Sequence, residues 1–315
     1  MPAVLDLLQR SLDGWIDGSA YALVGLGLTL TFGTLRRLNL AYGATAMLAA
    51  YVGAWLFSRH ALPAWGVAVC MVGLAGLIGL YVERLCFSVP RHAGGHEGRG
   101  SATPLGGGFD GREVVALASS FALWMQLEQL AVNLLPRHLN VFPNLASQTE
   151  WTWLGLHIRP DRLLVALLAV GLALALALWL QHTRSGLAWR ATATQRTAAG
   201  LVGIEVGRVQ ATAFLVACAL SGVAAFAVLA TEGQVTPMLG MWMLTKGLVA
   251  AMLGGLGHVR GVLWGGWLLG FVEAHAQALF GAVGREFATY ALLFLVLVLG
   301  PAGRPGLRNK VAHAA

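Results

Sequence analysis

Long apolar blocks separated by shorter polar segments follow one another along most of the chain. Most blocks approach the roughly 20 residues that an α-helix needs to cross about 30 Å of hydrocarbon. They are rich in Leu, Ala and Gly and lack the alternation over about ten residues that marks the strands of a membrane barrel. The pattern predicts an all-α, polytopic transmembrane bundle, because helices satisfy their own backbone hydrogen bonds in lipid.

The blocks predict nine spans in a single transmembrane domain covering residues 1–315. Eight or ten spans are also compatible, because hydropathy does not separate short re-entrant pieces from full spans. The expected spans are 16–32, 44–57, 65–86, 114–135, 163–180, 209–230, two within 241–280, and 287–299. We expect the break within 241–280 to fall near Gly254–Arg260.

Two polar segments orient the bundle. Residues 182–208 contain four arginines and a single acid, so the positive-inside rule places this segment and the basic C-terminal tail in the cytoplasm. Residues 88–112 are Gly-rich and lack apolar periodicity, which predicts a flexible loop. Counting spans backwards puts this loop and Arg36-Arg37 in the cytoplasm and the N-terminus outside.

Composition supports a membrane protein and excludes several other classes. Only 11% of residues are charged, against about 25% in soluble domains, and mean hydropathy is +0.69. The net charge of +7 lies mostly in loops and the tail, so it indicates topology rather than nucleic-acid binding. The chain has no phosphate-binding loop and no hydrolase motif, and the histidines at 92 and 96 lie in the Gly-rich loop. We therefore expect no enzymatic activity, no metal and no cofactor.

Residues 191–204 (ATATQRTAAGLVGI) predict a short amphipathic helix on the cytoplasmic side. Connections between neighbouring helices are often much shorter than this. A basic surface of small residues suits docking to a soluble partner. A loop that faces lipid headgroups explains the pattern equally well.

Glycines near the end of the chain repeat at intervals of four residues, a spacing that lets helix backbones approach closely in a membrane. The residues are Gly257, Gly261, Gly265, Gly266 and Gly270. The pattern is compatible with a tightly packed, sliding helix interface and with ordinary helix packing.

Three ionisable residues fall within apolar stretches, where an unpaired charge is costly. For Glu128, a place in a translocation pathway and a position near the membrane interface are equally compatible. Lys246 lies near a predicted span end, which favours snorkelling to the interface. Glu273 lies deeper, which favours a place in a pathway or a buried pair.

The segment between the first two spans contains Asn39, Tyr42 and Gly43. A polar side chain and a glycine there suit an irregular turn at membrane depth. Such a turn is tolerated only where it is buried or lines a cavity. We therefore count these three residues among the candidate pathway residues.

Four stretches resemble the permeases of ABC importers for branched-chain amino acids and related small solutes. They are residues 18–54, residues 184–209, residues 246–274 and Pro301-x-Gly303, together about a third of the chain. The opening stretch resembles the first-type permease of a pair. It differs from the family's Asn-Phe-Ala-His-Gly turn at Leu40 and Tyr42, and residues 94–111 lengthen a loop that the family keeps short.

The resemblance implies a permease subunit of the cell inner membrane that opens alternately to the two sides. Its implied partners are two cytoplasmic ATPases, a second permease, either identical or different, and an extracytoplasmic solute-binding protein. The implied solute is a branched-chain or related amino acid, with urea or a short amide as alternatives. The implied ATPase-coupling residues are Arg184, Gly186, Arg190, Ala191, Arg196, Gly203, Ile204 and Arg208.

A secondary transporter or channel driven by an ion gradient is the alternative. Glu128 and Glu273 would then be its proton or ion sites.

Overall fold

Ten α-helices make up most of the described part of the chain in the computed structural model. The structure describes residues 2–35, 37, 39–60, 62–87, 111–134, 151–153, 156–158 and 160–299. The helices are α1 (Pro2–Leu35), α2 (Ala41–His60), α3 (Ala64–Val82), α4 (Gly111–Leu134), α5 (Pro160–His182), α6 (Arg184–Thr194), α7 (Arg196–Leu201), α8 (Val206–Glu232), α9 (Leu239–Gly254) and α10 (Val259–Leu299). A π-helical turn, η1 (Glu83–Phe87), extends α3, and β1 (Trp151–Trp153) pairs antiparallel with β2 (Leu156–Ile158).

The predicted helical membrane bundle is confirmed, and the described residues of each of the nine predicted apolar segments fall within helix. Six helices in the described residues are long and apolar enough to cross a membrane, fewer than the nine predicted spans. The difference arises because α9 has only 16 residues, α2 falls short in hydropathy, and α10 is a single element of 41 residues. Gly281 bends α10, with φ +72° and ψ −163°, and divides it into two arms.

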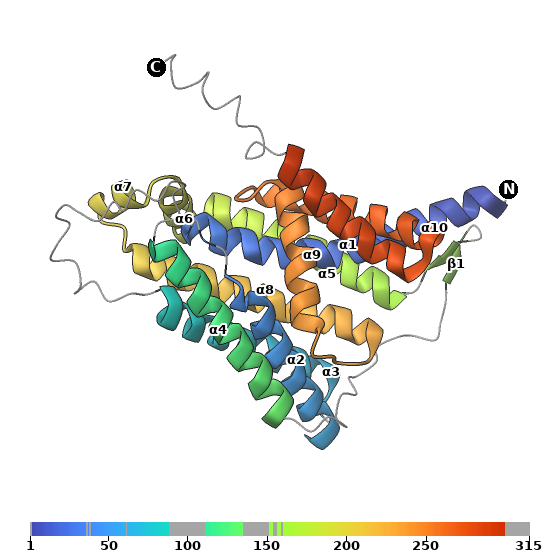
Figure 1. Ribbon diagram of the computed structural model, residues 1–315, viewed down its shortest axis with the longest axis horizontal. Coiled ribbons are helices and arrows are strands. Elements are labelled where there is room, and N and C mark those ends of the chain that lie inside the picture. The colour runs from blue at the N-terminus through green and yellow to red at the C-terminus, as the bar shows by residue number, and fades with distance from the viewer. Residues whose placement is uncertain are drawn as a thin grey trace, which may run out of the picture.

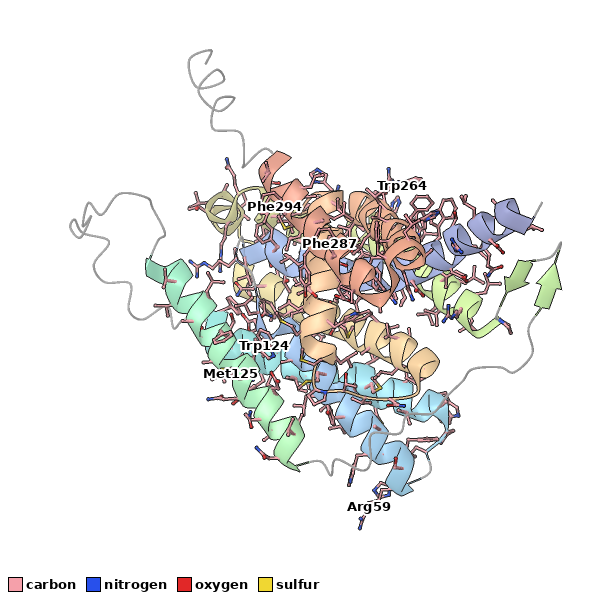
Figure 2. The ribbon with its side chains drawn as sticks, turned by 45° about the vertical axis from the view of Figure 1, so that its right-hand side comes forward. Arg59, Trp124, Met125, Trp264, Phe287 and Phe294 are labelled. Carbon is pink, nitrogen blue, oxygen red and sulfur yellow. The ribbon has the colours of Figure 1, made fainter. Side chains whose placement is uncertain are left out.

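Helix α1 forms the centre of the bundle (Figure 1). It packs against α10, α8, α9 and α5. In its apolar stretch of 18 residues 94% of the residues are buried, compared with 22% in the corresponding stretch of α5. The outer helices turn large apolar side chains outward. Met125 of α4 and Trp264, Phe287 and Phe294 of α10 lie on the outside of the molecule (Figure 2). A helix buried on all sides and outer helices with exposed apolar faces fit a bundle surrounded by lipid.

Glycines let α1 and the first arm of α10 pack backbone to backbone. A Cβ on Gly18 would lie 2.5 Å from the carbonyl oxygen of Gly266, and a Cβ on Gly270 would lie 2.7 Å from Gly18 Cα. Gly14 lies against Gly270 in the same antiparallel contact. Small residues on both helices therefore set this spacing, as is typical of membrane helix pairs.

The other glycines of the predicted stripe have different neighbours. Gly261 and Gly265 pack against Gly254 and Ala250 of α9, on another face of α10. Gly257 does not belong to the helix, so its assignment to helix packing is wrong. It lies in the connection between α9 and α10 with φ +94°, a conformation that glycine adopts without steric cost. The predicted break near Gly254–Arg260 is confirmed at this connection.

Several predicted segments lie outside the described residues. They are the Gly-rich loop and insert up to residue 110, Arg36, most of the polar segment 136–160, and the basic tail from residue 300.

Replacing Gly266 with Val should destabilise the fold, because its Cβ would lie 2.6 Å from Ala22 Cβ and 2.7 Å from Gly18 O. Overpacking of this kind costs about 1–3 kcal/mol. The matched control is Gly73→Val on α3, where nothing lies within 4 Å of an added Cβ. Thermal unfolding in detergent should show a lower midpoint for Gly266→Val than for the control, and equal midpoints would contradict the close packing.

Candidate functional site

The helices α6 and α7 form a compact element at one end of α1 (Figure 1). Thr183 caps α6, because its hydroxyl accepts a hydrogen bond of 3.0 Å from the Gly186 N–H. Gly186 is buried, and a Cβ there would collide with the Trp179 carbonyl and the Leu180 backbone of α5. Only glycine therefore allows α6 to fold back so closely onto the end of α5.

Trp189 attaches the same element to α1. Its side chain is 4% exposed, and its indole N–H donates a hydrogen bond of 3.3 Å to the Leu30 carbonyl. The indole ring lies where a Cβ on Gly33 would be, so α1 approaches it closely. One short helix is thus fixed to both α1 and α5.

The outward surface of this element carries basic and apolar side chains. The predicted residues Arg184, Arg190, Arg196, Gly203 and Arg208 are exposed, whereas Gly186 is buried and Ala191 and Ile204 are half-buried. The surface also contains large apolar residues that the sequence analysis did not single out. They are Leu187, Leu201 and Val202, and the last two are 86% and 76% exposed.

The predicted amphipathic helix is divided into two, because Gln195 is extended (φ −145°, ψ 102°) between α6 and α7. Two arginines are held by neighbouring side chains. Arg196 donates a hydrogen bond of 2.8 Å to the amide oxygen Oε1 of Gln210, and Arg208 pairs with Glu205 at 2.6 Å. The element is therefore an ordered part of the bundle.

The turn between α1 and α2 is buried. The Asn39 side chain accepts from the Ala41 N–H at 3.1 Å and so caps the start of α2. The Tyr42 hydroxyl lies 3.1 Å from the Val24 carbonyl and 3.3 Å from that of Ala217. This contact places the first turn of α2 beside the middle of α1. The chain therefore turns back after the end of α1, and α2 begins next to a part of α1 that lies earlier in the sequence.

Gly43 lies against the backbone of α9, where a Cβ would collide with the Gly240 carbonyl. The structure thus places Asn39, Tyr42 and Gly43 at a junction of α1, α2, α8 and α9.

A cluster of charged side chains lies deep in the bundle between α1, α9 and the two arms of α10. Lys246 is 0% exposed and Glu273 is 1% exposed, and Lys246 Nζ lies 2.5 Å from Glu273 Oε1. Lys246 also donates to Thr289 Oγ1 at 2.7 Å, and Thr289 in turn donates to Glu273 Oε1.

The second oxygen of Glu273 holds the other half of the cluster. Oε2 accepts from the Tyr21 hydroxyl at 3.0 Å and from Arg285 Nε at 3.2 Å. Arg285 also donates to the Tyr21 hydroxyl at 2.5 Å and lies 3.7 Å from Asp17. Four donors therefore surround one buried carboxylate, which is the arrangement that a buried charge requires.

The structure changes the interpretation of the three ionisable residues. Snorkelling of Lys246 is wrong, because α9 is covered by α1 and α10 and the ammonium is paired inside. Glu273 is the anion of that pair. Glu128 is half-buried on α4, which packs on α2 and η1 and lies on the other side of the bundle from α10 (Figures 1 and 2). The two glutamates are therefore not neighbours.

Several residues of the cluster escaped the sequence analysis. Asp17 and Tyr21 lie at the start of the first span, and Arg285 and Thr289 lie on the second arm of α10, after the bend at Gly281. Arg285 lies between two apolar stretches, where a charge is unremarkable at a span boundary. The sequence did contain one indication that Arg285 belongs to the cluster, because it is a second cation near Glu273 in a region with few charges.

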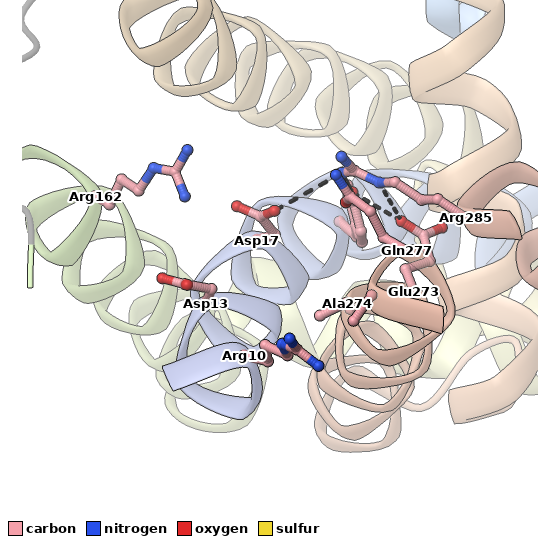
Figure 3. A pocket seen from close by; sticks show the side chains of 11 residues that line it. Arg10, Asp13, Asp17, Arg162, Glu273, Ala274, Gln277 and Arg285 are labelled. Atoms are coloured by element: carbon pink, nitrogen blue, oxygen red, sulfur yellow. Dashed lines mark hydrogen bonds and ion pairs between the residues drawn. The ribbon is translucent and has the colours of Figure 1, made fainter. Parts of the chain in front are cut away.

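A cavity of about 300 Å³ opens beside the cluster, at the N-terminal end of α1 (Figure 3). Asp13 and Asp17 of α1, Arg162 of α5, and Glu273 and Arg285 of α10 are among its lining residues. This cavity lies beside Asp13 and Asp17 of α1, whereas the α6–α7 element contacts α1 near its other end, at Leu30 and Gly33. In the described residues, no group of three or more His, Cys, Asp or Glu side chains could hold a metal ion.

Residues 11–92 and 106–300 match the family described as branched-chain amino acid transport system, permease component. The chain belongs to this family. The resemblance inferred from the sequence is thereby confirmed, and the chain is a permease subunit of an ABC importer embedded in the membrane by several helices.

Curated relatives match this permease over nearly its whole length. The high-affinity branched-chain amino acid transport system permease protein BraD of Pseudomonas aeruginosa is 27% identical, over 96% of this chain and 97% of its own. The permease protein LivH of Escherichia coli K12 is 28% identical over 95% of each chain. A probable branched-chain amino acid transport permease protein LivH of Methanocaldococcus jannaschii is 23% identical over 94% and 91%.

Replacing Glu273 with Gln should destabilise the permease more than replacing Lys246 with Met. Loss of Glu273 removes the shared anion of Lys246 and Arg285 and leaves them only the longer contacts to Glu286 and Asp17, whereas loss of Lys246 leaves Glu273 paired with Arg285. Breaking a buried pair costs about 3–5 kcal/mol. The measurement is thermal unfolding in detergent, with Glu128→Gln as the control on α4. Equal midpoints for Glu273→Gln and Glu128→Gln would contradict the role of the cluster.

Proposed function

We propose that this permease opens alternately to the two sides of the membrane, driven by ATP hydrolysis on separate cytoplasmic subunits through α6 and α7. The observation that carries the proposal is the attachment of α6 to two spans at once. Trp189 bonds to Leu30 of α1, and Gly186 packs against the end of α5. A displacement of α6 would therefore act on both α1 and α5.

The outward surface of α6 and α7 suits a protein partner. Exposed arginines surround the apolar side chains of Leu187, Leu201 and Val202. Apolar side chains with a charged rim are typical of protein–protein contacts. The positive charge of the segment favours the cytoplasmic side, where ATPase subunits would reach it. In this orientation the N-terminal end of α1 faces outside.

The partners that we propose are two cytoplasmic ATPases, a second permease, identical or different, and an extracytoplasmic binding protein. The solute that we propose is a small amino acid with a branched side chain, because the curated relatives carry that substrate in their names. Asn39, Tyr42 and Gly43 would act as a fixed junction near the pathway, because they connect four helices in the interior.

Ion coupling through Glu128 and Glu273 has less support. A proton site needs a carboxylate that can change its partners. Both oxygens of Glu273 are occupied by donors, two of which come from cationic side chains. Glu128 lies on α4, away from the cluster.

Replacing Arg190 or Arg196 with Glu should uncouple ATP hydrolysis from solute uptake, because a reversed charge on this surface would weaken docking to the ATPase. Uptake per ATP hydrolysed should fall about tenfold, which corresponds to ~1.4 kcal/mol. The measurement is simultaneous uptake and ATPase activity in proteoliposomes containing the whole transporter. The control is Arg59→Glu, at the far end of α2 (Figure 2). Unchanged coupling in both α6–α7 variants would refute the role of this surface.

A further inference from the structure

Two cavities adjoin at the N-terminal end of α1 and share part of their walls. The larger has a volume of about 300 Å³ and the smaller about 130 Å³. Asp17, Tyr21, Arg162 and Arg285 line both of them. These four polar side chains therefore lie between the two cavities and form part of the wall of each.

The larger cavity is lined by equal numbers of acidic and basic side chains. They are Asp13, Asp17 and Glu273, and Arg10, Arg162 and Arg285. Away from bulk water, a charged group is stabilised chiefly by a partner of opposite sign. A lining of both signs accordingly suits a solute that carries one charge of each sign, and suits a simple anion or cation less well.

Asp17 and Arg162 face each other (Figure 3) and can both bind a solute. Glu273 is surrounded by its four donors, and Arg285 is engaged by Glu273 and Tyr21. Asp17 lies 3.7 Å from Arg285, too far for a hydrogen bond, and its side chain is 42% exposed. Arg162 has no ion pair or hydrogen bond within the part of the chain that the structure describes. Figure 3 shows its guanidinium facing Asp17 with no interaction drawn between them.

The smaller cavity has an apolar part beside these charged groups. Ile16, Val165, Val228 and Trp242 line it. Its volume of about 130 Å³ corresponds to roughly four water-sized groups, which is the size of an isobutyl side chain. By the same measure the larger cavity holds on the order of ten such groups, enough for the backbone of an amino acid with water around it.

We propose that the two cavities together form a transit site for an α-amino acid with a short branched side chain. Arg162 binds the carboxylate, Asp17 binds the ammonium group, and the side chain enters the smaller cavity. Guanidinium–carboxylate pairs are strong and directional, so Arg162 fixes the orientation of the solute. Buried Glu273 holds Arg285 in place at the wall. The site rests on the proposed transport function and adds the location and chemistry of a solute-binding step within this chain.

The same two helices connect the transit site to the α6–α7 element. On α1, Asp17 lines the site, and Leu30, about 20 Å further along the helix, accepts the hydrogen bond from Trp189. On α5, Arg162 lines the site, and Trp179 contacts Gly186. A relative movement of α1 and α5 at α6 would therefore change the gap between Asp17 and Arg162, the two groups that hold the solute.

The test is equilibrium binding of radiolabelled leucine to the permease–ATPase complex in lipid nanodiscs without the binding protein. Wild-type complex should show saturable binding. Arg162→Gln and Asp17→Asn should each weaken it about tenfold or more, because each removes a charge-assisted hydrogen bond. Arg162→Lys, which keeps the charge, should bind better than Arg162→Gln. The matched control, Arg59→Gln, is an exposed arginine at the end of α2 and should bind as wild type does.

A second variant tests the smaller cavity by specificity. Val165→Phe fills its volume, so leucine should bind at least about tenfold more weakly while alanine, as a competitor, keeps its affinity. A purely structural defect would weaken both solutes alike. Retained ATPase activity in each variant shows that the complex is assembled.

Three outcomes would overturn the transit site: no saturable binding to wild type, equal binding by Arg162→Gln and Arg59→Gln, or an unchanged leucine-to-alanine ratio in Val165→Phe. Loss of binding-protein association in the Arg162 and Asp17 variants, with leucine binding intact, would show instead that these charges dock a protein. ATP-driven leucine uptake by the wild-type transporter with its binding protein tests the proposed function separately. If the wild-type transporter takes up leucine but the expected differences in leucine binding are not found, only the transit site is refuted.

Discussion

The interior of this permease depends on the buried ion pair between Lys246 and Glu273. A single unpaired charge at this depth would cost several kcal/mol. Each member of the pair also has a second partner of opposite charge, Glu286 for Lys246 at 3.4 Å and Arg285 for Glu273 at 3.2 Å. The pair is completed by Thr289, Tyr21 and Arg285, which come from α1 and from the second arm of α10. The bend at Gly281 brings that arm back to the cluster. Charge neutralisation thus fixes how α1, α9 and both arms of α10 lie together.

Close packing by glycine makes this arrangement possible. The first arm of α10 meets α1 along Gly14, Gly18, Gly266 and Gly270, without side chains between the backbones. At that distance Glu273 can accept a hydrogen bond from Tyr21. Without a hydrophobic driving force between helices in lipid, such van der Waals contact and internal hydrogen bonds are the main sources of association. The glycine contacts and the charge cluster therefore both stabilise the packing of α1 against the first arm of α10.

Helix α1 connects the two ends of the molecule on which transport would depend. Its C-terminal part holds α6 through Leu30 and Gly33, and its N-terminal part lines the charged cavity through Asp13 and Asp17. Helix α5 makes a second connection between the same two regions. The apolar central part of α1 is almost completely buried, whereas the peripheral α4 packs mainly on α2 and η1.

The sequence by itself determined the helical class, the positions of the apolar segments, the family, and the exposed basic segment at 184–208, because hydropathy, charge and local motifs are properties of neighbouring residues. It also identified Glu273 as a costly charge. Only the tertiary structure decided what pairs with it, because Tyr21 and Lys246 are 252 and 27 residues away along the chain. The same holds for the burial of Lys246, which depends on the helices that cover α9. Local hydropathy cannot show which helices will cover a given side chain, and that covering determines both the charge cluster and the cavities beside it.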